Sequence, residues 1–423
     1  MAQGPTGQGK SPSRPLEGVR VLAVEQMQAL PYATQMLARL GAEVVKVEPL
    51  HGESGRSAQP SVTDEAGRPA GATFLRNNLG KRSIAIDLKS EQGRELLLRL
   101  AESFDVFAEN LGPGRADRYG LSYETLAARN SRLIYLSVTG FGKEPADSPY
   151  SEWPAYACVA EAMTGIYEYS RRPNQPPVIN PVGGLGDTGT GLFGVIGVLA
   201  ALRHRETTGL GQLVDIAMYD SMLSICDLPA NYWSMGMRNE PDTELRVPYL
   251  LKSFRSKDGW CVLQVSRPHQ FKRLAQLLGH DDWISDDRFA HGYGWYDHWT
   301  DEIQPALENW AAGRTTTEAA AALAGASITA APCFTADQVV SDTHARRRNM
   351  LIEIPRTDGV NDPVIVAGNA VKLSAVPDQI EPRPPLLGEH TVEVLADALG
   401  LEAAEIADLT AAGILGCDKI LSS

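Results

Sequence analysis

Between Val19 and Gly142 the sequence alternates short apolar runs with segments whose apolar residues recur at helical spacing. The apolar runs predict strands over 19–26, 42–48, 82–88, 105–110 and 132–142. Helices are predicted between them over 31–40, from Ser90 onward and near 123–128, with Pro31 beginning the first and Gly41 ending it. Apolar strands that alternate with helices form parallel sheets covered on both faces. The sequence therefore predicts an α/β fold with a Rossmann-like parallel sheet.

A long apolar helix is predicted over 188–205, after a Pro-rich loop at 171–184. Its residues are apolar nearly all round, which predicts that the helix is buried. A strand over 212–218 and a helix over 219–233 follow it. We expect these elements to complete a large α/β domain over residues 16–235.

After about residue 240 the pattern changes, which predicts a smaller α+β domain over 236–330. It begins with a hairpin over 254–265 that turns at Asp258-Gly259. Helices follow near 268–278 and from Thr315, which can form a capping box with Glu318. Two further strands, at 328–334 and 349–355, and two helices within 390–415 complete the chain.

Composition and charge exclude several classes of protein. The net charge of −13 comes without a basic face, so no nucleic-acid partner is expected. No run of about 18 apolar residues occurs, so no membrane span is predicted. Residues 1–15 are polar and rich in Gly, Pro and Ser; they lack the apolar core of a signal peptide and are predicted as a disordered tail.

Cysteine and histidine usage points to a reducing setting without a metal. The five cysteines lie far apart with no CxxC, so no disulfide framework is implied. The eight histidines are equally dispersed, and no Cys/His cluster is present. We therefore predict no metal site and a cytoplasmic location.

Residues 184–189 read GLGDTG, which fits the G-x-G-x-x-G pattern of dinucleotide-binding loops. That pattern requires a strand directly before it and a helix directly after it. The helix is predicted, but Pro176, Pro177 and Pro181 crowd the approach, where the strand would have to be. The glycines therefore favour another chemistry over the binding of a dinucleotide.

Asp187, inside this motif, has two possible roles. It is predicted at the start of a helix, where the free N–H groups and the helix dipole favour a carboxylate, so it could be a helix cap. The glycines also leave its side chain approachable and let backbone N–H groups face a developing oxyanion, so it could be a covalent nucleophile. The residues alone leave both roles open.

Several motifs, in this order along the chain, resemble the family III CoA-transferases, the group that contains formyl-CoA transferase and carnitine CoA-transferase and is related to the α-methylacyl-CoA racemases. The resemblance covers nearly the whole chain from Leu16. It is carried by 16–49, by NNLGKRS within 77–97, by ENLGPGRADR within 109–124, by GGLGDTGTG within 183–223 and by PPLLGEHT within 384–395.

This resemblance implies roles for individual residues. The family's nucleophilic Asp matches Asp187, and its active-site Gln matches Gln28. Contacts with CoA or its acyl group are implied for Arg118, Tyr156, Lys81, Arg82, Gly184 and Gly186. From charge alone, the basic residues among them fit surface salt bridges equally well.

The sequence also departs from formyl-CoA transferase. Leu30 stands where that enzyme has Gly, which is expected to narrow the acyl pocket, and no GGGG loop occurs. The racemases carry His at the position of Tyr156. A Tyr with its ordinary pKa near 10 is a poor general base at neutral pH, which favours a transferase over a racemase.

The resemblance implies a large domain whose C-terminal part, 331–423, returns after the inserted small domain, and two chains interlocked as a homodimer. It implies CoA transfer from an acyl-CoA to a carboxylic acid through an aspartyl anhydride and an aspartyl-CoA thioester, with CoA as substrate and no tightly bound cofactor. An acyl-CoA racemase and a CoA-binding protein without catalysis remain the alternatives.

Overall fold

The computed structural model describes residues 14–143, 148–167, 172, 174–179, 184–237, 246–376 and 383–417. The predicted disordered tail, apart from Arg14 and Pro15, lies outside the described residues. The chain divides into a larger unit, Met1–Tyr167, Val178–Gly236 and His344–Ser423, and a smaller unit, Glu168–Pro177 and Met237–Thr343. The domains 16–235, 236–330 and 331–423 stay a prediction.

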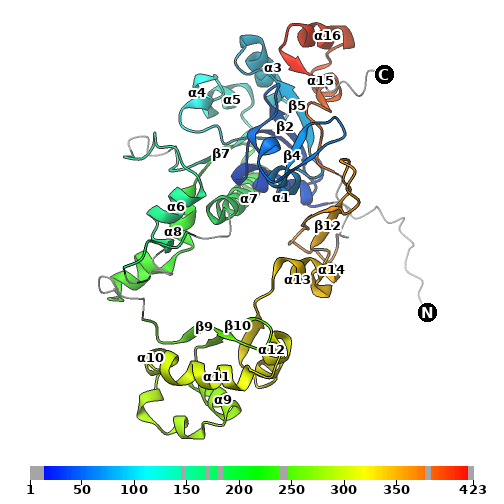
Figure 1. The fold of residues 1–423 in the computed structure, drawn as a ribbon. Helices are drawn as coiled ribbons and strands as arrows, with labels where there is room; N and C mark the ends of the chain where they lie inside the picture. The colour runs from blue at the N-terminus through cyan, green and yellow to red at the C-terminus, as the bar shows by residue number, and fades with distance from the viewer. Residues whose placement is uncertain are drawn as a thin grey trace, which may run out of the picture. The chain divides into compact units, whose positions relative to one another are not determined.

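The larger unit is built on a seven-stranded sheet with the order β14-β5-β2-β1-β6-β7-β8. Figure 1 labels β2, β5 and β7 of this sheet. Its strands are β1 (Arg20–Val24), β2 (Glu43–Glu48), β5 (Arg82–Ile86), β6 (Val106–Glu109), β7 (Ile134–Thr139), β8 (Leu213–Ala217) and β14 (Leu415–Gly416). Neighbouring strands are parallel except β14, which runs antiparallel to β5. The predicted parallel sheet of an α/β fold is therefore confirmed.

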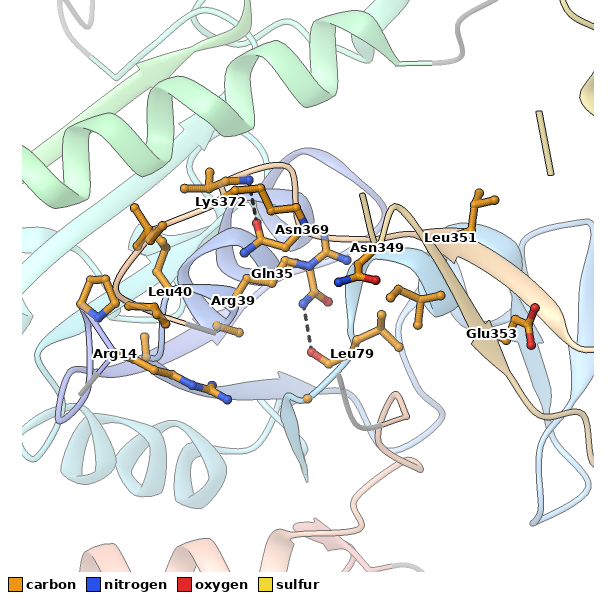
Figure 2. Close-up of a pocket in the computed structure, with 18 of the residues that line it drawn as sticks. Arg14, Gln35, Arg39, Leu40, Leu79, Asn349, Leu351, Glu353, Asn369 and Lys372 are labelled. Atoms are coloured by element: carbon orange, nitrogen blue, oxygen red, sulfur yellow. Dashed lines mark hydrogen bonds between the residues drawn. The ribbon is translucent and has the colours of Figure 1, made fainter. Parts of the chain in front are cut away.

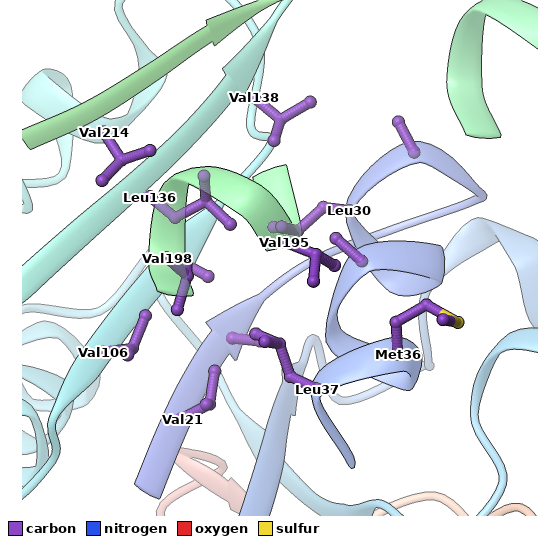
Figure 3. Close-up of a cluster of buried hydrophobic side chains, with 14 of the residues drawn as sticks. Val21, Leu30, Met36, Leu37, Val106, Leu136, Val138, Val195, Val198 and Val214 are labelled. Carbon is purple, nitrogen blue, oxygen red and sulfur yellow. The ribbon is translucent and has the colours of Figure 1, made fainter. Parts of the chain in front are cut away.

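Helices cover both faces of this sheet because successive side chains of each strand point to opposite faces. In β1, Val21 and Ala23 belong to one core cluster, together with α1 (Ala29–Arg39) and α7 (Leu185–Thr208) (Figure 3). Leu22 and Val24 belong to a second cluster, which includes α3 (Glu91–Ala101), α15 (Thr391–Leu399) and α16 (Ala403–Ala411). Strands apolar on both faces are what the sequence pattern indicated.

Two local signals in the sequence are confirmed at helix ends. Ser90 caps α3, since its Oγ accepts a hydrogen bond from the Gly93 N–H at 2.9 Å. The first predicted helix begins two residues before Pro31 and ends before Gly41, which has a φ of +110°. That left-handed backbone explains why a glycine ends the helix there.

One part of the prediction for α7 is wrong, because the helix is not buried all round in this chain. Gly191 and Val198 face the core, and the absence of a side chain at Gly191 lets the backbone of α1 approach closely. Leu192, Ile196 and Leu199 are 45%, 60% and 37% exposed. Within the described residues, α7 is also the one helix long and apolar enough to cross a membrane, a test that core helices pass as well.

The larger unit contains further short elements. They are a 3-10 helix η1 (Ser54–Ser57), β3 (Ser61–Thr63), β4 (Pro69–Gly71), α2 (Ala72–Asn77), α4 (Arg115–Arg118), α5 (Tyr123–Arg129), α6 (Ala157–Met163), α8 (Met218–Ser224), a π-helical turn η3 (Leu228–Tyr232), β12 (Leu351–Ile354) and β13 (Val364–Ala367). β12 pairs with β13, and β3 with β4, both antiparallel. α14 (Thr343–Arg347) lies at the boundary of the two units.

The smaller unit combines an antiparallel sheet with helices. Its sheet has the order β11-β10-β9, and β9 and β10 form the predicted hairpin. The elements are β9 (Leu250–Arg255), β10 (Trp260–Val265), α9 (Pro268–Leu278), η4 (Asp281–Ile284), η5 (Asp287–Phe289), α10 (Gly292–Asp297), η6 (Trp299–Ile303), α11 (Gln304–Ala311), α12 (Thr316–Gly325), β11 (Thr329–Pro332) and α13 (Ala336–Ser341). The capping box of Thr315 and Glu318 is confirmed at the start of α12.

Candidate active site

The order of the parallel strands marks the position between β1 and β6 as the place where a ligand is expected to bind. From β1 the chain moves to β2 on one side and later returns to β6 on the other, so the direction of winding reverses between β1 and β6. In open parallel sheets, ligands bind beyond the carboxyl ends of the strands at such a reversal. Gln28 follows β1, and Arg118 follows β6 through α4.

The loops that follow β1 and β6 are joined by hydrogen bonds. The Gln26 N–H donates to Asn110 Oδ1 at 3.0 Å, and Asn110 Nδ2 donates to the Gln26 carbonyl at 3.0 Å. Gln28 therefore lies two residues after a backbone position that is held against the end of the neighbouring strand β6.

Asp187 lies in the first turn of α7 but does not cap the helix. The capping position belongs to Gly184, whose φ of +90° is left-handed, and Asp187 is the third helical residue. The Asp187 carboxylate accepts no hydrogen bond from the residues that the structure describes. Burial, reinforced by the nearby Glu161 carboxylate, raises the pKa of Asp187 to about 6.

Gln28 and Asp187 meet around Gly184. Gln28 Nε2 donates a long hydrogen bond of 3.5 Å to the Gly184 carbonyl. A Cβ atom on Gly184 would lie 2.0 Å from Gln28 Nε2 and 2.9 Å from Asp187 Oδ2. The space that this glycine leaves is therefore bordered by the amide of Gln28 and the carboxylate of Asp187.

Glu161, on α6, is a residue that the sequence reasoning missed. It is only 2% exposed; its Oε1 accepts from the Gly186 N–H at 2.8 Å and its Oε2 from the Tyr167 hydroxyl at 2.9 Å. The Gly186 N–H, expected to face an oxyanion, is thus occupied by a carboxylate of the same chain. A glutamate on a short helix is usually exposed to solvent, so nothing in the pattern marked this one.

Tyr156 precedes α6 and is 70% exposed, so its ring is open to a ligand. The next residue, Ala157, packs against α7: a Cβ atom on Gly186 would lie 2.8 Å from the Ala157 Cα. This close approach brings the start of α6 to the turn that carries Asp187.

The structure does not place Lys81 and Arg82 where a ligand could use their charges freely. Lys81 is buried, and its Nζ lies 2.7 Å from Glu25 Oε1 and within hydrogen-bond distance of three further oxygens of the chain. Arg82 pairs with Glu43 at 2.6 Å and with Glu393 at 2.9 Å. Both charges are paired within the chain, and a contact of either residue with CoA stays a prediction.

Arg118 has the opposite surroundings. It is exposed at the end of α4, and among the described residues its guanidinium makes one hydrogen bond, a long one of 3.4 Å from Nη2 to the Pro113 carbonyl. A guanidinium held this loosely can turn toward a phosphate.

Leu30 differs from its prediction. Its side chain is 0% exposed and lies in the core cluster between α1 and the sheet (Figure 3). The comparison with formyl-CoA transferase had suggested that Leu30 narrows an acyl pocket. The structure instead packs this side chain into the core.

The site at Asp187 is distinct from a cavity of about 640 Å³ beside α1. Gln35, Arg39, Leu79 and Asn349 line this cavity, and Gln35 Nε2 donates to the Leu79 carbonyl at 3.0 Å (Figure 2). None of the predicted site residues lines it. Across the described ranges, no group of three His, Cys, Asp or Glu residues could hold a metal ion.

Comparison with known proteins relates this geometry to one family. The sequence model described as CoA-transferase family III matches residues 16–391. Succinyl-CoA:mesaconate CoA-transferase of Haloarcula hispanica is 32% identical over 90% of this chain and 96% of its own length. Formyl-CoA:oxalate CoA-transferase of Streptomyces avermitilis is 31% identical over 95% of this chain and 100% of its own.

A solved structure agrees with these relatives. A CAIB/BAIF family protein from Brucella suis superposes with a TM-score of 0.78 at 31% identity, over 91% of this chain and 100% of its own. Fold and sequence agree over nearly the whole length, so the chain belongs to CoA-transferase family III and is a CoA-transferase.

Proposed function

We propose that this enzyme moves CoA from an acyl-CoA donor to a carboxylic acid through covalent intermediates on Asp187. The observation that carries the proposal is the Asp187 carboxylate, which is largely withdrawn from water and accepts no hydrogen bond from the described residues. An ionised carboxylate with so little solvation is destabilised before the reaction and reacts more readily as a nucleophile.

The reaction proceeds as four exchanges at carbonyl carbons. An oxygen of Asp187 attacks the donor thioester and expels CoA thiolate, which leaves an aspartyl–acyl anhydride. The thiolate then attacks the Asp187 carbonyl carbon and releases the donor acid, giving an aspartyl-CoA thioester. The acceptor carboxylate attacks that thioester and expels the thiolate again, and the thiolate finally attacks the acceptor carbonyl and frees Asp187. An activated acyl group is conserved throughout, so the steps need neither ATP nor a tightly bound cofactor.

Each attack places negative charge on a carbonyl oxygen, and we assign Gln28 to stabilise it. Its amide borders the same space as the Asp187 carboxylate, next to Gly184. A fixed N–H donor at such an oxygen lowers the barrier more than any contact made equally with the substrate. The N–H of Gly186 takes no part, because it already donates to Glu161.

Asp187 must be ionised to attack, so the pH dependence of the reaction tests its surroundings. The pKa of about 6 predicts that kcat/KM is constant above neutral pH and falls as the pH drops through about 6. Glu161→Gln removes the neighbouring negative charge, so the fall should move to lower pH. Tyr167→Phe keeps that charge and is the matched control. A pH profile that Glu161→Gln leaves in place would contradict this electrostatic coupling.

We propose that Arg118 binds a phosphate of CoA, since its guanidinium is exposed beside the strand reversal. Arg118→Ala should weaken CoA binding roughly ten- to a hundredfold, the loss expected for a charged hydrogen bond. Isothermal titration calorimetry with CoA measures this. Arg115→Ala, also exposed on α4, is the control. An unchanged dissociation constant in Arg118→Ala would remove Arg118 from the site.

The substrates are proposed only as classes: an acyl-CoA and a small carboxylic acid. The named relatives act on succinyl-CoA with mesaconate and on formyl-CoA with oxalate. The acyl groups of both CoA thioesters are short, and so are both acids. We propose short-chain substrates for this enzyme as well. Mass spectrometry over a panel of acyl-CoA donors and acids would identify the pair, and turnover only of long-chain acyl groups would contradict the proposal.

We also propose a homodimer, located in the cytoplasm. Leu192, Ile196 and Leu199 form an exposed apolar stripe on α7, a surface that a second chain could cover. Light scattering should then report about twice the mass of the 45.7 kDa chain. A monomer at micromolar concentration would contradict the dimer.

A further inference from the structure

Four charged side chains form a buried chain beneath the turn that carries Gln28. Lys81 Nζ lies 2.7 Å from Glu25 Oε1, Lys46 Nζ lies 3.4 Å from the same oxygen, and Lys46 Nζ lies 3.5 Å from Glu53 Oε1. All four side chains are at most 2% exposed. Buried ion pairs seldom add net stability, because removing charges from water costs as much as their attraction returns. Their presence here calls for another role.

The buried chain ends on the backbone directly before Gln28. Glu53 Oε2 accepts a hydrogen bond from the Met27 N–H at 3.0 Å. Met27 has a φ of +60°, a left-handed conformation that is unfavourable for a residue with a side chain. Since Asn110 holds Gln26 from the other side, the turn is fixed at two consecutive residues, and Gln28 is the next.

The other end of the buried chain fixes the first turns of α1. Lys81 Nζ donates to the Pro31 carbonyl at 3.0 Å and to Thr34 Oγ1 at 2.7 Å, and Thr34 Oγ1 donates to Glu25 Oε2 at 2.6 Å. Gln28 immediately precedes this helix. Its backbone is therefore constrained on both sides by the same group of charges.

We propose that the buried chain Lys81–Glu25–Lys46–Glu53 positions the Gln28 amide against Asp187, with Glu53 as the positioning residue that holds Met27 in its left-handed conformation. This rests on the proposed function, in which Gln28 stabilises the oxyanion. It also assigns Lys81, expected from the resemblance to lie near CoA, to the scaffold of the catalytic amide. A misplaced catalytic group lowers kcat, whereas the binding of CoA does not depend on it.

A double-mutant cycle tests the proposal, using Glu53→Gln in the wild-type enzyme and in Gln28→Ala. In the wild-type enzyme Glu53→Gln should lower kcat roughly tenfold, with KM for the acyl-CoA little changed. In Gln28→Ala the same substitution should lower kcat by less than about twofold, because no amide is left to position. Equal losses in both backgrounds would overturn the proposal, since a general structural effect does not depend on Gln28.

The proposed function can fail separately in this experiment. If Gln28→Ala alone keeps the wild-type kcat, the oxyanion role of Gln28 is wrong and the positioning role falls with it. If Gln28→Ala lowers kcat but the losses from Glu53→Gln are equal, only the positioning role is wrong. Should Glu53→Gln not fold, Asn110→Ala takes its place, because it removes the half-buried side chain that holds Gln26 on the other side of the turn. The loss of kcat from Asn110→Ala should likewise depend on Gln28, and equal losses in both backgrounds would overturn the proposal.

Discussion

Asp187→Ala is expected to abolish CoA transfer, with kcat falling by about a thousandfold or more, because the proposed acyl anhydride forms on the Asp187 carboxylate. The fold should remain intact. Asp187 accepts no hydrogen bond from the described residues and is not the N-cap of α7, so its removal leaves no donor unpaired. Steady-state turnover and the thermal unfolding midpoint together measure the two effects.

Asp220→Asn is a matched control for this substitution. Asp220 is also the third residue of its helix, α8, and partial desolvation together with the Asp215 carboxylate raises the pKa of its carboxyl as well, although its side chain is more exposed than that of Asp187. It should keep transfer activity within about threefold of the wild type, a small effect of the kind usual away from a reacting centre. Asp187→Ala with near wild-type turnover would reduce Asp187 to a residue that only favours the start of a helix.

Gln28→Ala should have the second-largest effect. Loss of one oxyanion donor typically lowers kcat by about a hundred- to a thousandfold. Because the amide is expected to contact the transition state rather than CoA, the dissociation constant of CoA should stay the same. Stopped assays for kcat and calorimetry with CoA separate the two quantities.

Gln28→Glu is the informative companion variant. It keeps the size of the side chain but replaces the N–H donor with a carboxylate, which adds a negative charge beside Asp187. Its kcat should be at least as low as that of Gln28→Ala. Activity retained in Gln28→Glu would show that the space at position 28, and not its hydrogen-bond donor, matters to catalysis.

The parallel sheet could be predicted because most of its strand residues are apolar on both faces, as in Val21 to Val24, and because helices between the strands carry end signals such as Ser90 and Gly41. Apolar periodicity in a sequence indicates which residues are buried, and few other features of the sequence specify a parallel sheet. β14 escaped prediction because its two residues, Leu415–Gly416, are too short to show a pattern.

The exposed stripe on α7 shows where the same reasoning fails. An apolar composition predicts that a surface is covered, but it does not say by which chain. In the sequence, Leu192 and Ile196 are apolar helix residues that cannot be told apart from Val198. Of the three, only Val198 is buried in the core cluster against the sheet.

In the candidate site, motif resemblance indicated Asp187 and Gln28, and the structure brings them together around Gly184. Glu161 and Glu53 could not be found in this way. Each acts on the backbone of a residue far away in the sequence, Glu161 on Gly186 and Glu53 on Met27. Lys81 shows a second limit: a lysine beside a matched motif suggested a ligand contact, and nothing in the sequence indicated that it pairs with Glu25, 56 positions away.

Chemical trapping tests the covalent role of Asp187 most directly. The enzyme is incubated with its acyl-CoA donor in deuterated water without an acceptor acid, then treated with hydroxylamine or borohydride, and its peptides are mapped by mass spectrometry. A thioester or anhydride on Asp187 predicts one modified residue, at Asp187, and little deuterium at the α-carbon of the acyl group. Rapid α-deuteration with no modification of Asp187 would contradict the covalent mechanism and indicate a racemase that acts through proton removal.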